Sequence, residues 1–224
     1  MAVLERPLSQ SSRVERLGAA SPVDQFQALA RLHLASIHGG IIENLGPRFL
    51  TLLYRQLSRR SEVVIYAAYR RNEIIGFVIG TINLVNSIRK IGLTGFAELA
   101  WTSCSNLWRP DLFRKVIQAS AYFGRRTADR QVTPAMLAAL DPTRAELLAI
   151  AVSENMRGQG LGRTLVNALE QEFANRGGRQ EYFVSTNRNE IGSNAFYRSA
   201  GFELIGQKNH HDLILNVYRK ELQP

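Results

Sequence analysis

Apolar residues recur every three or four positions in two stretches near the start of the chain, which is the spacing of one face of a helix. The first stretch covers residues 22–36 and the second covers residues 44–57. Gly39 and Gly40 lie between them and interrupt the pattern. The sequence therefore predicts two helices that pack as a helical hairpin.

Two segments rich in β-branched and aromatic residues follow, at residues 62–68 and 74–82. Such residues favour strands, and the polar run Arg70-Arg71-Asn72 between the segments is typical of a turn. The pattern predicts a β-hairpin. Residues 83–142 carry a weaker helical pattern, clearest at residues 107–126, and we interpret this segment as a mostly helical insertion.

The last third of the chain alternates between strand-like and helix-like patterns. A wholly apolar strand is predicted at residues 147–152, followed by a helix that opens at Gly158–Gly162 and ends at Asn175. A strand at residues 182–185 and a short helix at 192–199 come next. A closing hairpin is predicted from residues 202–205 and 213–218, with its turn at residues 208–211. The order of elements is ααββ, insertion, βαβαββ, which predicts an α/β sandwich built on a mixed sheet with flanking helices.

Length and composition bound the organisation of the chain. Its 224 residues, of which 45% are hydrophobic and 21% are charged, fit a single globular domain. We assign that domain to residues 21–224 and interpret residues 1–20, which lack any sustained pattern, as a flexible N-terminal tail. Because no continuous apolar stretch resembles a signal peptide or a membrane span, we expect a cytoplasmic protein.

Cysteine usage and net charge narrow the chemistry further. The single cysteine, Cys104, excludes an intramolecular disulfide and fits a reducing compartment. The net charge of +9 raises the question of a polyanionic partner. The arginines are scattered along the chain rather than gathered in one run with aromatic residues. We therefore interpret the charge as an ordinary solvated surface, with phosphate steering as the second explanation and nucleic-acid binding as the third.

The sharpest motif is the run from Arg157 to Gly162, which lies between the apolar strand and the following helix. Glycines at such a junction let the chain turn tightly, so that free N–H groups at the helix start can face an anion. A dinucleotide-binding loop requires the spacing G-x-G-x-x-G, and a nucleoside triphosphate loop requires a lysine at its end. Glycines at 158, 160 and 162 followed by Arg163 fit neither of these loops.

The remaining pattern, Arg-x-x-Gly-x-Gly, resembles the coenzyme A pyrophosphate loop of the GNAT superfamily of N-acyltransferases. The run from Asn194 to Phe202 is similar to the late signature of that family, which ends in Phe-Tyr, three residues and Gly-Phe. The resemblance covers residues 147–202. It implies a GNAT-type sandwich with a mostly antiparallel central sheet, acetyl-CoA as co-substrate, and direct transfer of an acetyl group to a primary amine in a ternary complex.

The resemblance also implies roles for individual residues. Glu146, at the start of the central strand, matches the basic glutamate of histone-type members and is the candidate base; a solvent-facing glutamate is the alternative. Tyr197 is the candidate acid that protonates the departing thiolate, with an ordinary core tyrosine as the alternative. A backbone N–H near residues 150–152 would polarise the thioester carbonyl. The candidate cofactor contacts are Ile150, Ala151, Val152, Arg157, Gly158, Gln159, Gly160, Leu161, Gly162, Arg163, Asn189 and Asn194.

One position departs from the family pattern. Many relatives carry an asparagine seven residues before the tyrosine, where this chain has Glu190. Asn189 or Asn194 is a candidate substitute for that contact. His38 and Glu43 flank the break between the first two helices, where the family places its acceptor site. They are candidate acceptor contacts, with helix capping as the alternative.

Other reactive residues do not form recognisable sites. His210 and His211 are adjacent and have no further ligand at metal-binding spacing, so we expect no metal. Cys104 lacks the partners of a nucleophile. The predicted acceptor is a small molecule, for which an amino sugar is one guess. The sequence leaves open a protein or peptide acceptor, a non-catalytic acyl-CoA-binding regulator, and the formation of a homodimer.

Overall fold

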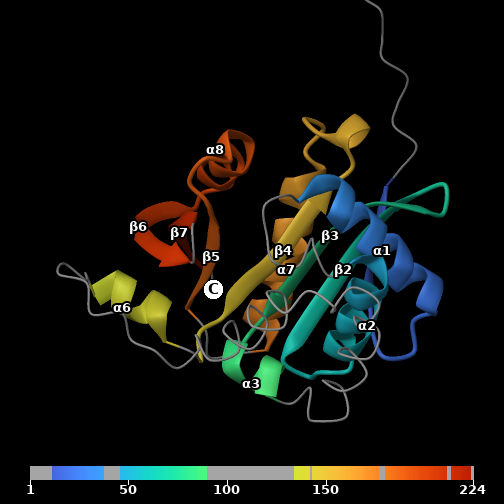
Figure 1. Cartoon of the computed structure of the whole chain (residues 1–224), viewed down its shortest axis with the longest axis horizontal. Coiled ribbons are helices and arrows are strands. Elements are labelled where there is room, and N and C mark those ends of the chain that lie inside the picture. Colours follow the sequence, from blue (N-terminus) through green and yellow to red (C-terminus); the bar gives the residue numbers. More distant parts are fainter. Residues whose placement is uncertain are drawn as a thin grey trace, which may run out of the picture.

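The computed structural model describes residues 12–37, 46–89, 134–141, 143–176, 180–210 and 213–222. The described residues form a seven-stranded sheet in the order β1-β2-β3-β4-β5-β7-β6 (Figure 1). Among the described strands, only β4 and β5 pair in parallel. The strands are β1 (Arg13–Leu17), β2 (Val63–Arg70), β3 (Glu73–Thr81), β4 (Glu146–Val152), β5 (Glu181–Asn187), β6 (Glu203–His210) and β7 (Leu213–Glu221). The predicted α/β sandwich with a mixed, mostly antiparallel sheet is confirmed.

Helices cover both faces of this sheet. The described helices are α1 (Val23–Ser36), α2 (Gly46–Ser58), α3 (Leu84–Arg89), α6 (Pro134–Leu140), α7 (Leu161–Asn175), α8 (Ile191–Ser199) and the short 3-10 helix η2 (Glu154–Met156). The helices α1 and α2 pack on one face of β2 and β3 around Phe26, Leu29 and Phe77. On the opposite face, α7 packs against β2, β3 and β4.

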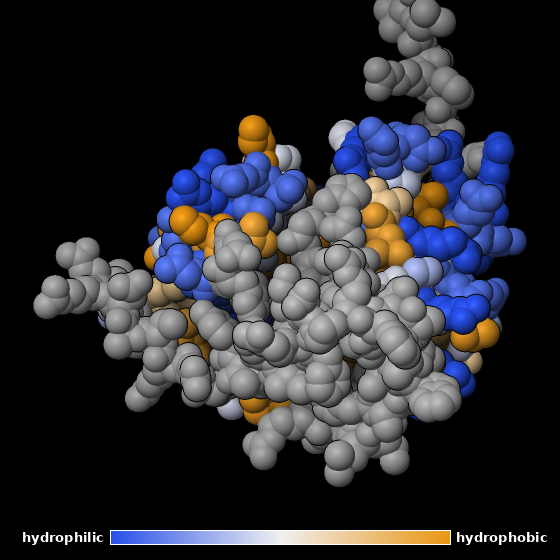
Figure 2. Space-filling model, in the orientation of Figure 1, coloured by the Kyte–Doolittle hydropathy of each residue, from blue (hydrophilic) through white to orange (hydrophobic). Residues whose placement is uncertain are grey.

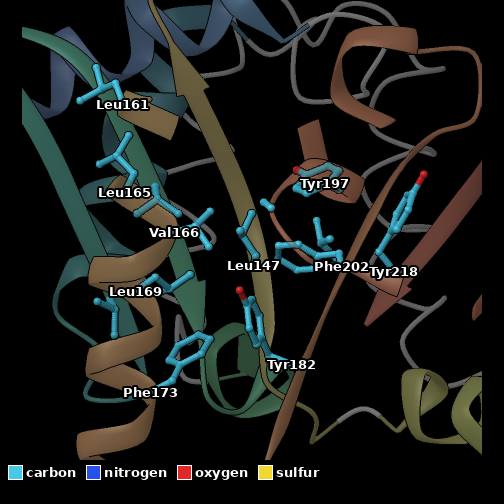
Figure 3. Close-up of a cluster of buried hydrophobic side chains, with 14 of the residues drawn as sticks. Leu147, Leu161, Leu165, Val166, Leu169, Phe173, Tyr182, Tyr197, Phe202 and Tyr218 are labelled. Carbon is cyan, nitrogen blue, oxygen red and sulfur yellow. The ribbon is translucent and has the colours of Figure 1, made fainter. Parts of the chain in front are cut away.

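The core under α7 accounts for the apolar repeat that predicts this helix in the sequence. Leu165, Leu169 and Phe173 follow the helical repeat and are fully buried (Figure 3). Phe173 meets Tyr182 of β5 edge to face at a centroid distance of 5.5 Å. Burying each such side chain stabilises the fold by about 1.5–3 kcal/mol. The cluster joins the two halves of the sheet through the helix that follows the glycine loop.

The N-terminal segment requires a correction. Residues 13–17, predicted as part of a flexible tail, form the edge strand β1 and pair antiparallel with β2. Arg16 forms an ion pair with Glu172 of α7 at 3.1 Å, and the guanidinium of Arg13 lies over the ring of Tyr69 at 5.1 Å. Charged residues are common on edge strands because they discourage pairing with other chains. Because residues 13–17 are mostly charged, the sequence pattern does not identify them as a strand.

The closing hairpin is longer than the sequence pattern predicted. The strand β6 continues to His210, which pairs with Leu213, so residues 208–210 belong to the strand rather than to the turn. Their polar character reflects an edge position, because β6 is the last strand of the sheet. The ends of the predicted helical insertion are helical, as α3 and α6. Residues 90–133 and residues 1–11 lie outside the described residues.

The described surface is largely hydrophilic over α1 and α8 on the face that Figure 2 shows, and hydrophobic residues appear there as separate patches. Exposed apolar side chains include Ile191 at the start of α8, which is 84% exposed. None of the described helices combines the length and the apolar character that a membrane span requires.

Candidate active site

The strands β4 and β5 are paired at one end only. A single register pair, Glu146 with Phe183, joins them, and the N–H of Phe183 donates to the carbonyl oxygen of Ala145 at 3.1 Å. Beyond this point the two strands diverge (Figure 1). We call the unpaired region, residues 147–152 of β4 and 184–187 of β5, the β4–β5 fork. Along the fork, no strand among the described residues pairs with this internal edge of the sheet.

A β-bulge in β4 accounts for the divergence. Ile79 of β3 pairs with Ala149 and Gly80 pairs with Leu147, which leaves Leu148 without an opposite residue. Such an extra residue bends its strand and increases the local twist. The bulge lies immediately after the last residue of β4 that pairs with β5. Leu148 is 36% exposed, although it lies in a central strand.

Two residues of β4 direct their backbone groups into the fork. The N–H of Ser153 donates to the carbonyl oxygen of Ile75 at 2.9 Å. Because successive residues of an antiparallel strand alternate in direction, Ala151 also faces β3, whereas Ile150 and Val152 face the fork. The prediction of a cofactor contact from the backbone of Ala151 is therefore wrong. The N–H groups of Ile150 and Val152 remain available on the fork side.

The loop after β4 presents a run of free N–H groups. Gly158 and Gly160 adopt left-handed backbone angles, with φ of 75° and 83°, which cost other residues about 1–2 kcal/mol. The first backbone bond of α7 runs from the N–H of Thr164 to the carbonyl of Gly160 at 3.1 Å. The N–H groups of residues 158–163 have no acceptor among the described residues. Together with the positive end of α7, these N–H groups have the geometry that suits an anion.

Gly162 serves a different purpose from the other two glycines. A Cβ atom at this position would lie 2.9 Å from the Phe196 ring of α8. Beside it, the guanidinium of Arg163 donates to the carbonyl oxygen of Ser199 at the end of α8, at 2.6 Å. This bond joins α7 to α8 and leaves other N–H donors of the exposed guanidinium, so the predicted cofactor contact of Arg163 stays a prediction.

The other loop side chains bind the loop itself. Arg157 donates through Nε to the carbonyl oxygen of Val152 at 3.2 Å. Gln159 donates through its amide to the carbonyl oxygen of Asn155 at 3.1 Å. Both side chains are exposed and hold the loop close to the end of β4. These side-chain bonds leave the backbone N–H groups of residues 158–163 for the anion that the sequence motif predicts, which stays a prediction.

Asn194 is a structural residue. Its amide nitrogen donates to the carbonyl oxygens of Asn187 (2.9 Å) and Glu190 (2.7 Å). Its oxygen accepts from Asn216 (2.7 Å) and from the hydroxyl of Tyr218 (2.8 Å). The side chain is buried and its hydrogen-bonding groups are all used. Of the two predicted substitutes for the family asparagine, only the exposed Asn189 has a side chain free for a cofactor.

Tyr197 lies in α8 on the face of the sheet that α7 covers. Its ring packs against Phe202 at a centroid distance of 5.4 Å, and in Figure 3 its hydroxyl is drawn on the side of the ring nearer to β4. No described residue hydrogen bonds to this hydroxyl. Burial raises the pKa of the Tyr197 phenol, so the phenol keeps its proton at neutral pH.

Glu146 lies on the opposite face of β4. Leu147 packs in the core with α7, so the side chain of Glu146 points the other way. It is buried, at 9% exposed, and its carboxylate forms an ion pair with Arg144 at 2.5 Å. The alternative of a solvent-facing glutamate is excluded. Glu146 and Tyr197 thus approach the fork from opposite faces of the sheet.

Comparison with known proteins decides the family. A model of the acetyltransferase (GNAT) family matches residues 33–202, which is most of the chain. This chain belongs to the GNAT family. A search of curated protein sequences gave no significant match.

Solved structures support the same fold for this GNAT chain. An N-acetyltransferase from Staphylococcus aureus Mu50 is 13% identical with a TM-score of 0.56, over 95% of this chain and 99% of that chain. The ribosomal-protein-S18-alanine N-acetyltransferase of Escherichia coli is 12% identical with a TM-score of 0.55, over 96% of each chain. A GNAT acetyltransferase from Streptococcus pneumoniae is 11% identical with a TM-score of 0.55, over 95% and 100%. At these identities the likeness shows the fold alone.

Several candidate residues of this GNAT chain remain untested. His38, Glu43, Cys104 and His211 lie outside the described residues, so their predicted roles stay predictions. Sequence reasoning missed Arg144, although its spacing of two residues from Glu146 places both side chains on one face of an extended chain. It also missed the bulge at Leu148, because a bulge depends on the pairing strand rather than on the local pattern.

Proposed function

We propose that this chain transfers an acetyl group from acetyl-CoA to a primary amine of a small molecule, by direct attack in a ternary complex. The observation that carries the proposal is the continuity between the free N–H groups of residues 158–163 and the unpaired edge of β4. The loop suits a diphosphate, and the adjoining edge suits a chain of amides that pairs like a strand. The amino sugar predicted from the sequence is one member of this acceptor class.

The cofactor supplies an activated acetyl group as a thioester, and residues of this chain supply the binding groups and the proton-transfer groups. The backbone N–H groups of residues 158–163 would hold the diphosphate, and the exposed side chain of Asn189 would add a contact to the cofactor. The backbone groups of Ile150 and Val152 would pair with the amides of the pantetheine arm. Their N–H groups also provide a donor for the acyl oxygen.

Proton transfers are assigned to the two faces of the fork. Glu146 would take the proton of the acceptor ammonium, directly or through a water molecule, because amines with a pKa near 10.4 are mostly charged at neutral pH. Arg144 holds this carboxylate in place. Tyr197, which keeps its proton, would donate it to the departing sulfur from the other face. Because Glu146 and Tyr197 lie on opposite faces of the sheet, the acceptor would enter from one face and the thiol would leave on the other.

Calorimetry with coenzyme A, followed by thiol release from acetyl-CoA across a panel of amines, tests the proposal. The double variant Gly158→Ala/Gly160→Ala forces two strained left-handed alanines into the loop, so we expect at least tenfold weaker binding. Gly192→Ala is the matched control, because the added Cβ meets no atom within 4 Å. Absence of binding to the native chain would refute the proposal. Binding without turnover for any amine would favour a non-catalytic acyl-CoA-binding regulator.

A further inference from the structure

Lys208 of β6 lies on the face of the sheet opposite to α7. The helix α6 packs on this face, where Met136 and Ala139 meet Phe183 and Val217. A Cβ at Gly206 would lie 3.0 Å from the sulfur of Met136. Because side chains two residues apart on a strand share a face, Lys208 leaves β6 on the α6 side. Glu146 points to the same face, so the two side chains lie on one side of the sheet.

The charges near Lys208 do not cancel. Glu146 already forms an ion pair with Arg144 at 2.5 Å, and no described residue forms an ion pair or a hydrogen bond with the Lys208 amine. Desolvation by burial lowers the pKa of Lys208, although Glu146 opposes this effect and Arg144 adds to it. The Nε of Arg144 is also buried without a hydrogen-bond partner among the described residues. A desolvated cation without a counter-ion destabilises the fold.

We propose that Lys208, together with Arg144, binds an oxyanion on the acceptor molecule, so that the acceptor of this enzyme is an amine that also carries a carboxylate or a phosphate. This inference rests on the proposed acetyl transfer. An acceptor anion would supply the counter-charge for Lys208 and the hydrogen-bond acceptor for Arg144 that the described residues do not provide. Its amine would then lie toward Glu146, which is at the closed end of the fork. The net charge of +9 would draw such an acceptor toward the chain.

A different role for Lys208 would be to act as the proton acceptor in place of Glu146. The topology disfavours it. Lys208 lies on β6, which β7 separates from β5, whereas Glu146 lies on β4 at the fork itself. Anion binding also accounts for the unpaired Nε of Arg144, which a proton-acceptor role does not. The two roles differ in kinetics, because an anchor for the acceptor acts on KM and a proton acceptor acts on kcat.

Matched pairs of amines test the proposal by thiol release from acetyl-CoA. The pairs are β-alanine with β-alaninamide, for a carboxylate, and O-phosphoethanolamine with ethanolamine, for a phosphate. We expect at least a tenfold higher kcat/KM for the anionic member of one pair, and which pair responds distinguishes the two anions. Lys208→Met should raise KM for that amine at least tenfold with kcat nearly unchanged, and Lys208→Arg should keep the preference. Arg59→Met, which removes one exposed charge after α2, is the control for net charge.

A second measurement does not depend on turnover. Trinitrobenzenesulfonate modifies free lysine amines, and mass spectrometry of the peptide that contains Lys208 reports the extent of modification. We expect propionate or ethyl phosphate, which carry the anion but no amine that would consume the reagent, to protect Lys208 in the native chain, and the neutral propionamide and ethanol to give no protection. Protection of Lys208 without acetyl transfer to any amine would refute the proposed function but would still support an anion site at Lys208.

Three results would overturn the inference while acetyl transfer stands. The first is equal kcat/KM for anionic and neutral amines. The second is a Lys208→Met enzyme that keeps the native KM and loses kcat, which would make Lys208 the proton acceptor. The third is Lys208 modification at the same rate with and without propionate or ethyl phosphate. Thermal melting of each variant shows whether it is folded, and Lys208→Arg separates loss of charge from loss of packing.

Discussion

Tyr197 and Glu146 show how burial and pairing set the chemistry of single residues. The ring of Tyr197 lies among aromatic neighbours that keep the phenol protonated. The carboxylate of Glu146 is buried but remains close to a cation, Arg144. A buried acid and a paired carboxylate on opposite sides of one strand edge suit the two proton transfers of the proposed acyl transfer.

Tyr197→Phe removes the proposed proton donor and keeps the ring. We expect turnover to fall at least tenfold, while the affinity for coenzyme A changes little, because the cofactor contacts are backbone groups of other elements. Steady-state kinetics and calorimetry measure the two quantities. Tyr66→Phe, which removes a phenol that donates to Glu172 at 3.2 Å, is the control. Unchanged turnover would remove Tyr197 from the mechanism.

Buried tyrosines also predict the response of the fold to alkaline pH. Burial raises the pKa of Tyr54, Tyr182 and Tyr197 above that of an unfolded tyrosine, which is near 10. Below pH 10 both states keep these protons and the stabilisation is complete. Above it the unfolded chain loses protons that the folded chain keeps, so the free energy of unfolding falls by up to about 1.4 kcal/mol per pH unit for each residue.

Ultraviolet absorbance of tyrosinate, combined with urea unfolding between pH 8 and 11, checks this prediction. The three buried tyrosines should ionise only when the chain unfolds. Ionisation of all tyrosines near pH 10 in the folded chain, without loss of stability, would contradict it.

The helices and strands that could be predicted are those with a complete apolar repeat in their own sequence. The helices α1, α2 and α7 and the strands β2, β3 and β4 each carry a complete apolar repeat, so their positions followed from the sequence within a few residues. The edge strand β1 and the polar end of β6 were missed because charged edge strands look like loops. The bulge at Leu148 and the ion pair of Arg144 with Glu146 depend on contacts between segments, which a local pattern does not contain.

The contact between α7 and α8 is the clearest test of packing between elements. Gly162→Ala would place a methyl group 2.9 Å from Phe196, so we expect a loss of about 1–3 kcal/mol in the free energy of unfolding. Gly192→Ala, in the open part of α8, should be neutral or slightly stabilising. Urea denaturation of both variants measures the difference. Equal stability of the two variants would show that α7 and α8 do not pack as closely as described.

At the scale of the whole molecule, the sheet is divided by the fork into two halves that α7 and its core bind together. One half carries the covering helices α1 and α2, and the other carries α6 and α8 (Figure 1). The fold match at 11–13% identity shows that very different sequences build this architecture. The glycine loop was predictable because its glycines and the start of α7 that follows them are local features of the sequence.

Amide hydrogen exchange of the native chain with and without coenzyme A, resolved by NMR to single residues, tests the central claim most directly. The account predicts that the N–H groups of Ile150, Val152 and residues 158–163 exchange rapidly without the cofactor and become protected when it binds. Those of Ala149 and Ala151, which face β3, should be protected in both states. Saturating coenzyme A that leaves residues 150, 152 and 158–163 unprotected, or protects another part of the sheet instead, would contradict it.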